Sequence, residues 1–414
     1  RDAEMERALR ELASPILAAA GQPAGSIRIF VIRDSSLNAF VRDSRSIFIH
    51  SGLLLRMNRP EMLQAVIAHE VAHIANGHLT RRPANARAAR NKAIAGTIAG
   101  ALVATQNPQA GAGIAVGSQS TAQRVFFSHT RAEEAAADQS GIRFMAQAGV
   151  DPQAMVEVME LFRGQEALSQ GRQDPYVRTH PLSRDRIRGI RGFVAGFSGN
   201  VKEDPRSAYW YARVQGKLSA YLRKPSYTLR RTKKSDTSDA ARVARAWAHH
   251  KNSNTKKALA EVDALIRTRP KDPYAHELRG QILLESRNFG ASVNAYRRAT
   301  ELAPREALIR AGYGQALLAA GEVRAAVPVL ERARDKDPFN PRLLRDLGVA
   351  YAKMGRNGEA SLATAERYML IGQAKNAGTH AKRAVGLLPQ GSTAWRRAQD
   401  ILDAAEVATK RKRK

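Results

Sequence analysis

The chain has 414 residues, which is long for a single domain and predicts two or three domains. Its 43% hydrophobic and 25% charged residues are those of an ordinary globular protein. Because the chain has no Cys, it can form neither disulfides nor thiolate metal sites, and a metal ion would have to be held by His, carboxylate or water. The net charge of +29, from 67 Lys and Arg against 38 Asp and Glu, predicts attraction to polyanions.

The basic residues are densest at 222–234 and in the tail at 410–414. Neither stretch carries the interleaved aromatic side chains of a surface that stacks on nucleic-acid bases. We therefore interpret most of this charge as solvated surface, with contact to an anionic membrane as the alternative, and we do not expect nucleic-acid binding. The sequence begins with Arg1 rather than Met, as expected for a mature or trimmed chain whose leader is not visible.

The first predicted elements are a helix and a small sheet. Residues 1–20 carry apolar side chains on one side at helical spacing, and the glycines within 21–25 end this helix. Three short apolar segments follow, at 27–32, 38–41 and 46–50, and we expect them to form strands.

A His-Glu-x-x-His motif is the next feature, formed by His69, Glu70 and His73. On a helix the two His residues share one face, so both imidazoles can bind one metal ion, and Glu70 can reach a water on that ion. Two His ligands with a carboxylate base are the arrangement of zinc proteases. The alternative is a surface helix with two incidental His residues.

The residues around the motif favour a helix. Asn58 and Pro60 give a start signal, an apolar stripe follows, and Gly77 gives a stop. Beyond it, residues 92–120 allow two interpretations. Their apolar part, 93–104, would span only about 18 Å as a helix, too short for a hydrocarbon core of about 30 Å. We expect a packed, buried helix there; the alternatives are a lid over the site and a hairpin that touches a membrane.

A second helix is predicted at 126–150, with Glu134 and Asp138 on one face. Zinc bound by two His residues needs a third protein ligand and an open position for water, and Glu134 can supply that ligand. Asp138 can accept a hydrogen bond from the outer nitrogen of a ligand His and so fix its tautomer. Glu133 is the nearest competitor, but its spacing from Asp138 places it off the shared face.

These segments resemble peptidase family M48, a family of zinc metallopeptidases. The order of LNAFV, IFIHSGLL and the metal helix is the family's order, although the usual Gly before the second His ligand is Ala72 here. The resemblance implies an α+β zincin-type domain in which Glu134 is the third zinc ligand, as the Glu of a Glu-x-x-x-Asp motif.

The strand of Asn38, Ala39 and Phe40 is a candidate edge strand in such a domain. An extended peptide can add itself to the free edge of a sheet. We therefore predict that these three residues bind substrate; the alternative is an interior strand.

A third candidate His lies in a Thr-His-Pro segment. The Pro that follows His180 favours an extended backbone, which presents the ring from a loop. In periplasmic members of the family, a His of such a segment either stabilises the transition state or occupies the water position as an inhibitory fourth ligand. The resemblance implies one of these roles for His180. We expect Arg184 or Arg186, on the next helix, to bind a substrate carbonyl oxygen or the developing oxyanion.

From residue 239 the sequence repeats with a period of 34, seen in Gly280, Gly314 and Gly348. This period is typical of tetratricopeptide repeats, each made of two antiparallel helices. Three full repeats fit before the phase shifts within a fourth that begins at Pro341. We expect one helix to be shared or missing there, with a capping helix afterwards; the alternative is an unrelated helical bundle.

The predicted fold is mainly α with a small β-sheet, followed by an all-α repeat solenoid. We divide the chain into a peptidase domain (1–200), a helical and basic linker (201–238), a repeat domain (239–408) and a basic tail (409–414). The resemblance then extends over the whole chain, to periplasmic M48 proteases that carry such repeats.

This resemblance implies a periplasmic, Zn²⁺-dependent endopeptidase with Glu70 as its base. Its substrates would be misfolded or stalled outer-membrane proteins, and its repeats would recruit them or the assembly machinery, with chaperone activity as well. The alternative is a chaperone or scaffold whose zinc site is kept shut and whose repeats do the work. A nucleic-acid-binding role, which rests on charge alone, is third.

Overall fold

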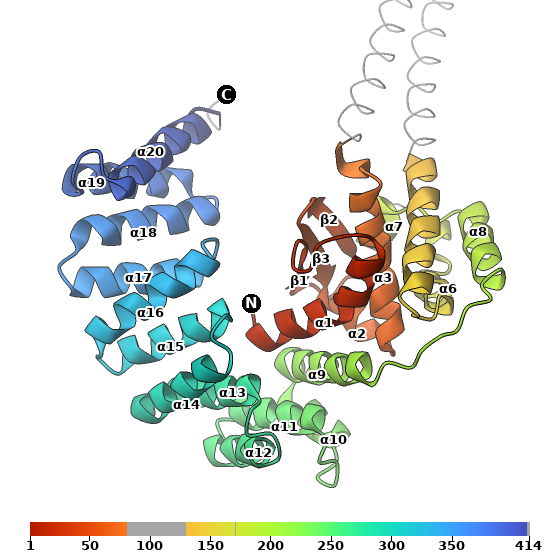
Figure 1. The fold of residues 1–414 in the computed structure, drawn as a ribbon, viewed down its shortest axis with the longest axis horizontal. Helices are drawn as coiled ribbons and strands as arrows, with labels where there is room; N and C mark the ends of the chain where they lie inside the picture. The colour runs from red at the N-terminus through yellow and green to blue at the C-terminus, as the bar shows by residue number, and fades with distance from the viewer. Residues whose placement is uncertain (81–129, 170, 412–414) are drawn as a thin grey trace, which may run out of the picture. The chain divides into compact units, whose positions relative to one another are not determined.

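The computed structural model describes residues 1–80, 130–169 and 171–411. The chain forms two compact units, one mainly of Met5–Leu218 and one mainly of Ser219–Lys414 (Figure 1). The segment predicted as a buried helix or a lid (92–120), the start of the helix expected at 126–150 and the end of the basic tail lie outside the described residues. Within the described ranges no helix is both long enough and apolar enough to cross a membrane.

A three-stranded sheet lies in the first unit, made of β1 (Arg28–Ile32), β2 (Ala39–Asp43) and β3 (Ser46–His50). The order is β1-β3-β2, with β3 parallel to β1 and antiparallel to β2. The central strand β3 is buried at Ile47 and Ile49. The segment expected to be an edge strand does lie at an edge of this sheet.

Helices make up most of the rest of this unit (Figure 1). They are α1 (Ala3–Ala19), α2 (Ser51–Arg56), α3 (Pro60–Ala75), a helix whose described part is 130–147, α6 (Gln153–Glu160), the 3-10 turn η1 (Gln165–Ala167), α7 (Pro175–Thr179), α8 (Arg184–Ala195) and α9 (Pro205–Leu222). The last of these crosses the division between the two units, inside the predicted linker. The boundaries of our four-part division stay a prediction.

Helix α3 is the most buried helix segment around the site, with every residue from Met62 to His73 buried. Its first residue is Pro60, as the start signal predicted, but the N-cap is Arg59 and no side chain caps the helix, so Asn58 does not have a capping role. At the other end Gly77 takes a left-handed backbone (φ 68°), which stops the helix as expected.

Helix α6 is shorter than the run of apolar residues from which it is formed. Its apolar spacing continues to Leu168, yet the helix ends at Glu160. The chain turns at Gly164, whose φ of 82° is incompatible with a right-handed helix.

The second unit is an all-α array. Its helices are α10 (Pro225–Arg231), α11 (Asp239–Lys251), α12 (Thr255–Thr268), α13 (Pro273–Glu285), α14 (Phe289–Leu302), α15 (Ala307–Ala319), α16 (Val323–Lys336), α17 (Pro341–Lys353), α18 (Asn357–Leu370), α19 (Ala374–Leu387) and α20 (Thr393–Arg411). Successive helices pack against one another along the array. This agrees with the predicted solenoid.

The period of 34 has a packing cause. A methyl group added at Gly280 would come within 2.6 Å of the Tyr296 ring, and one added at Gly314 within 2.4 Å of Leu330. The two contacted residues are themselves 34 apart in the chain. The repeated Gly therefore lets the two helices of each repeat approach closely, with one larger side chain filling the space.

The predicted change of phase is resolved as a shared helix. In the regular part, alternate helices touch: α13 contacts α15, and α15 contacts α17. After this point the alternate contact is between α18 and α20, while α18 also packs closely on both α17 and α19. Helix α18 is thus the second helix of one pair and the first of the next.

Candidate metal centre

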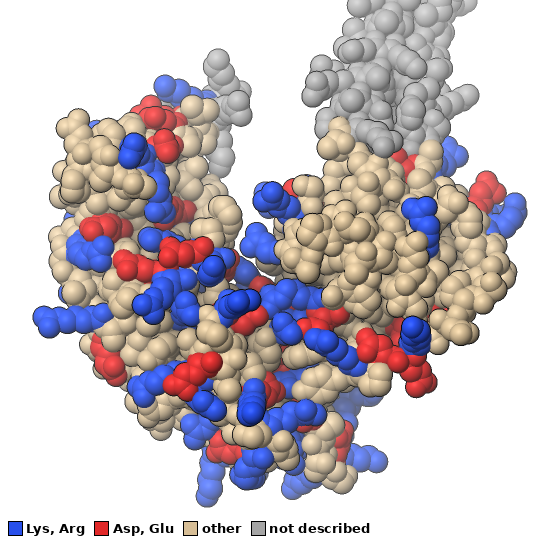
Figure 2. Space-filling model, viewed as in Figure 1, with Lys and Arg blue, Asp and Glu red and all other residues tan. Residues whose placement is uncertain are grey.

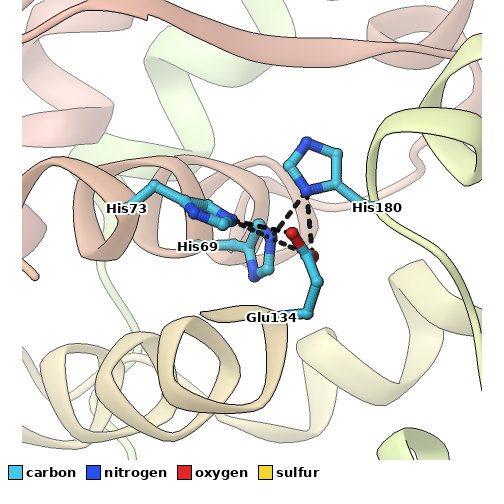
Figure 3. A group of neighbouring side chains, drawn as sticks. All are labelled: His69, His73, Glu134 and His180. Atoms are coloured by element: carbon cyan, nitrogen blue, oxygen red, sulfur yellow. Dashed lines mark hydrogen bonds and ion pairs between the residues drawn. The ribbon is translucent and has the colours of Figure 1, made fainter. Parts of the chain in front are cut away.

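Four side chains from three distant segments of the chain meet in the first unit (Figure 3). His69 and His73 come from α3, Glu134 from the helix at 130–147, and His180 from the residue that ends α7. One nitrogen or oxygen atom of each lies within 4.8 Å of the others, and all four residues are buried.

The distances between these atoms suit one small tetrahedral cation. With metal–nitrogen bonds of about 2.0–2.1 Å, neighbouring ligand atoms of a tetrahedral zinc site are about 3.3 Å apart. Nε2 of His69 lies 3.1 Å from Nε2 of His73, 3.2 Å from Nδ1 of His180 and 3.3 Å from Oε2 of Glu134. Nitrogen and carboxylate donors are also the ligands zinc prefers in a protein without Cys.

Charge at the donor set is balanced by its neighbours. Burial opposes ionisation of Glu134, but His180, His69 and Arg186 hold the pKa of this carboxyl well below its usual value. Burial likewise opposes a charge on His69, yet Asp138 and Glu134 raise the pKa of its imidazole to about 9. A cation that binds here competes with a proton for His69.

Glu70 is fully buried beside the donor set. Among the described residues neither of its carboxylate oxygens has a hydrogen-bond partner, and Nε2 of His180 lies 3.5 Å from Oε1. A buried carboxylate without a donor is costly, and it is the form in which a base receives a proton from water.

Asp138 faces the outer side of a ligand ring, with its Oδ1 2.9 Å from Nδ1 of His69. Arg186 holds this carboxylate with two nitrogens, and its Nη1 is 3.1 Å from Oε2 of Glu134. Because of this pairing the pKa of Asp138 is lowered in spite of burial.

The contact of Arg184 or Arg186 with a substrate oxygen stays a prediction, but the surroundings of the two arginines differ. Arg184 is exposed at the start of α8, whereas Arg186 is buried. The guanidinium of Arg186 is engaged by Asp138 and Glu134, and it donates to the backbone oxygen of His180 at 3.2 Å. It thus connects two carboxylates of the site with the loop that carries His180.

The predicted substrate strand is only partly available. The backbone oxygen of Asn38 accepts a hydrogen bond from His50 of β3 at 2.9 Å, so Asn38 and, two residues on, Phe40 direct their backbone groups inward. Ala39 points its N–H and C=O to the outer edge, but this residue is fully buried.

The segment at the start of α7 covers that outer edge just before β2. The backbone N–H of Leu37 donates to Oδ1 of Asp174, and its oxygen accepts from the N–H of Tyr176, each at 3.2 Å. The same short helix ends at His180. One element, α7, therefore covers the strand edge at its start and carries the fourth donor, His180, at its end.

Two residues of the site, His78 and Tyr176, were not identified from the sequence. His78 is buried, with its Nδ1 2.9 Å from Nδ1 of His73, and its sequence signal is a further His five residues after His73, directly behind Gly77. Tyr176 is fully buried between Phe162 and His180, with ring centroids 4.7 Å from each. Nothing in the spacing of the sequence distinguishes Tyr176 from a core aromatic residue.

Comparison with known proteins agrees with this geometry. Residues 1–194 match the model of peptidase family M48, and three overlapping stretches match a tetratricopeptide-repeat family: 243–307, 278–341 and 313–377. The peptidase part of the chain belongs to family M48. The protein is accordingly a metalloprotease with tetratricopeptide repeats, which confirms the fold class and the family predicted from the sequence.

Several curated relatives share both parts. The chain is 24% identical over 354 residues to the beta-barrel assembly-enhancing protease of Escherichia coli, covering 83% of this chain and 71% of that protein. It is 23% identical over 394 residues to the protein of the same name from Yersinia pestis, covering 93% of this chain and 78% of that one. The metalloprotease LoiP of Escherichia coli is 28% identical over 173 residues, 41% of this chain and 63% of LoiP.

Proposed function

We propose that the protein is a zinc-dependent endopeptidase whose metal is bound by His69, His73 and Glu134. The observation that carries the proposal is the group of buried donor atoms within 4.8 Å of one another beside Glu70, whose carboxylate oxygens accept no hydrogen bond from the described residues. A zinc ion there would supply Lewis acidity that polarises the scissile carbonyl and makes a water a better nucleophile. Glu70 takes the proton of the attacking water and passes it to the leaving amine.

His180 keeps this centre shut in the state described. Catalytic zinc needs three protein ligands and an open position, and Nδ1 of His180 stands 3.0 Å from Oε2 of Glu134, as a fourth donor would. Of the two roles that the resemblance implied, this geometry supports the inhibitory one. Asp138 orients His69 on the opposite side of the donor set.

Substrate binding requires the same element to move. An extended substrate chain would pair with the outer edge of β2 at Ala39, between Asn38 and Phe40. Two residues before Ala39, the backbone of Leu37 is already hydrogen-bonded to the start of α7. Withdrawal of α7 would therefore open the strand edge and remove His180 from the centre together.

The natural substrates that we propose are misfolded or stalled outer-membrane proteins in the periplasm. The support is the name of the relatives that share both parts of the chain, which refers to beta-barrel assembly. Repeat solenoids bind peptides and protein partners, so the repeats are proposed to recruit substrate or the assembly machinery.

Peripheral contact with an anionic membrane is the part of the proposal that rests on charge. On the face shown in Figure 2, Lys and Arg side chains are interspersed with Asp and Glu over the repeat helices rather than gathered in one basic patch. This distribution favours solvated charge over that face, and any such contact is assigned to the basic linker and tail.

The second candidate function is a chaperone or scaffold that works through its repeats. The four-donor arrangement favours it, because a centre closed by His180 binds metal without cleaving peptides. The two functions are compatible if the closed centre is a resting state.

One experiment separates them: cleavage of casein or an unfolded outer-membrane barrel by zinc-loaded wild type, His180→Ala and Glu70→Gln. We expect low activity in the wild type, at least tenfold more in His180→Ala, and none in Glu70→Gln with zinc retained. Full activity in Glu70→Gln would refute the assigned base. Zinc bound in all three proteins with no cleavage by any would favour the chaperone or scaffold.

A further inference from the structure

The chain folds back on itself directly after the metal helix. Helix α3 ends at Ala75, and the left-handed backbone of Gly77 reverses the chain, so that His78 returns to the side of α3 that carries His73. The two rings meet edge to face, with centroids 4.9 Å apart and planes at 73°. His78 is only 3% exposed. His78 is therefore an ordered, buried residue packed directly against the donor set.

The contact joins the two nitrogens that face away from the donor set. Nδ1 of His78 lies 2.9 Å from Nδ1 of His73, while Nε2 of His73 is 3.1 Å from Nε2 of His69. A neutral imidazole binds a metal through the lone pair of one nitrogen and carries its proton on the other. With Nε2 directed at the donor set, the proton of His73 is on Nδ1, and Nδ1 of His78 must be the acceptor.

We propose that His78 is a positioning residue that holds His73 in its metal-binding tautomer and orientation. It does for His73 what Asp138, 2.9 Å from Nδ1 of His69, does for the other ligand ring. The two partners differ in charge: one is a carboxylate neutralised by Arg186, the other an uncharged ring. His78 thus orients a ligand without adding a second carboxylate that lacks a cation.

This inference rests on the proposed binding of zinc by His73, but it does not depend on peptide cleavage. The test is the dissociation constant for zinc, measured on the full chain by competition with a chelating dye, for wild type, His78→Leu and His78→Asn. Leu and Asn have the same shape, but only Asn offers an oxygen near the place of Nδ1. Loss of such an outer partner weakens metal binding by about 10- to 100-fold.

We expect that loss in His78→Leu and recovery of most of the affinity in His78→Asn. The melting temperature of each variant without metal reports folding separately, and we expect the two variants to melt alike. Equal zinc affinity in His78→Leu and wild type would overturn the proposal. Equal weakening in His78→Leu and His78→Asn would also overturn it, because an acceptor at this position would then make no difference.

Two control variants show whether a negative result contradicts the role of His78 or the proposed set of zinc ligands. His276→Leu changes a His of the repeat unit and should leave the zinc affinity of the chain unchanged. His73→Ala should bind zinc far more weakly than any His78 variant. If His73→Ala binds as tightly as wild type, the proposed ligand set is wrong; if it fails to bind while His78→Leu binds normally, only the role of His78 is wrong.

Discussion

At the scale of single residues, several buried polar groups near the site have no hydrogen-bond partner among the described residues. They include the carboxylate of Glu70, the side-chain oxygen of Asn38 and the hydroxyl of Tyr176, and similar groups occur elsewhere in the chain, as at Thr228 and Trp247. Leaving a neutral polar group buried and unpaired costs about 1–3 kcal/mol. At Glu70 an unpaired carboxylate is what the proposed role as base requires.

Tyr176 gives a test of this cost. Burial and the charge of Glu70 raise the pKa of its hydroxyl well above the usual value of 10, so the group stays protonated. Tyr176→Phe removes an unpaired hydroxyl from an aromatic ring stacked on Phe162, and the free energy of unfolding should be unchanged or rise by about 1 kcal/mol.

The matched control is Tyr211→Phe, because the hydroxyl of Tyr211 accepts a hydrogen bond from Gln215 at 2.7 Å. This variant should lose about 1 kcal/mol in the same denaturant titration. Equal losses in the two variants would mean that the Tyr176 hydroxyl has a partner in solution.

At the scale of elements, the centre depends on the close approach of two helices. Gly141 lies on the helix that carries Glu134 and Asp138, and a methyl group there would come within 3.3 Å of backbone atoms of Ala68 and His69. The absence of a side chain at this position lets Glu134 come close to His69 and His73 of α3. A short element, α7, then closes the centre from the other side.

Gly141→Ala should push these two helices apart by a few tenths of an ångström. Extra volume in a packed interface costs about 1–3 kcal/mol, which outweighs the gain of about 0.5–1 kcal/mol from replacing a helical Gly. We expect a net loss of about 1 kcal/mol in the free energy of unfolding and weaker zinc binding, measured by denaturation and by chelator competition.

Gly189→Ala, in α8, is the matched control, since nothing lies within 4 Å of an added methyl group there. It should stabilise the protein by about 0.5–1 kcal/mol and leave zinc binding unchanged. If Gly141→Ala is instead stabilised and binds zinc normally, the two helices can accommodate a methyl group at this contact, and the predicted steric effect is wrong.

At the scale of the whole molecule, the two compact units are stabilised differently. The first contains the buried charged centre, and the second is held together by the stacked small and large side chains of its repeats. Binding to the native state stabilises only the unit that holds the site. The response to metal should therefore be confined to one unit.

Removal of zinc by a chelator should lower the melting temperature of the first unit alone. A ligand at a thousand times its dissociation constant contributes about 4 kcal/mol, which for a unit of this size is roughly 10 °C. Scanning calorimetry with and without the chelator measures the shift. The Glu134→Gln variant identifies which transition belongs to the first unit. In this variant that transition should already have a low melting temperature, and the chelator should change it little. An equal shift of both transitions would contradict the independence of the units.

Features that depend on a local period along the chain could be predicted from residue order alone. The helical spacing of four placed His69 and His73 on one face with Glu70 beside them, and the same spacing paired Glu134 with Asp138. The repeat of 34 residues predicted the second unit and its change of phase. These inferences succeed because helix geometry and repeat packing are set by residues close in the chain.

Which distant groups meet, and through which atoms, became clear from the three-dimensional fold. It brings Nδ1 of His180 to the donor set, turns Arg186 rather than Arg184 onto the carboxylates, and returns His78 to His73. It also covers the strand edge with α7. Such contacts are fixed by the packing of whole elements and by the direction of each side chain, which residue type and spacing along the chain do not specify.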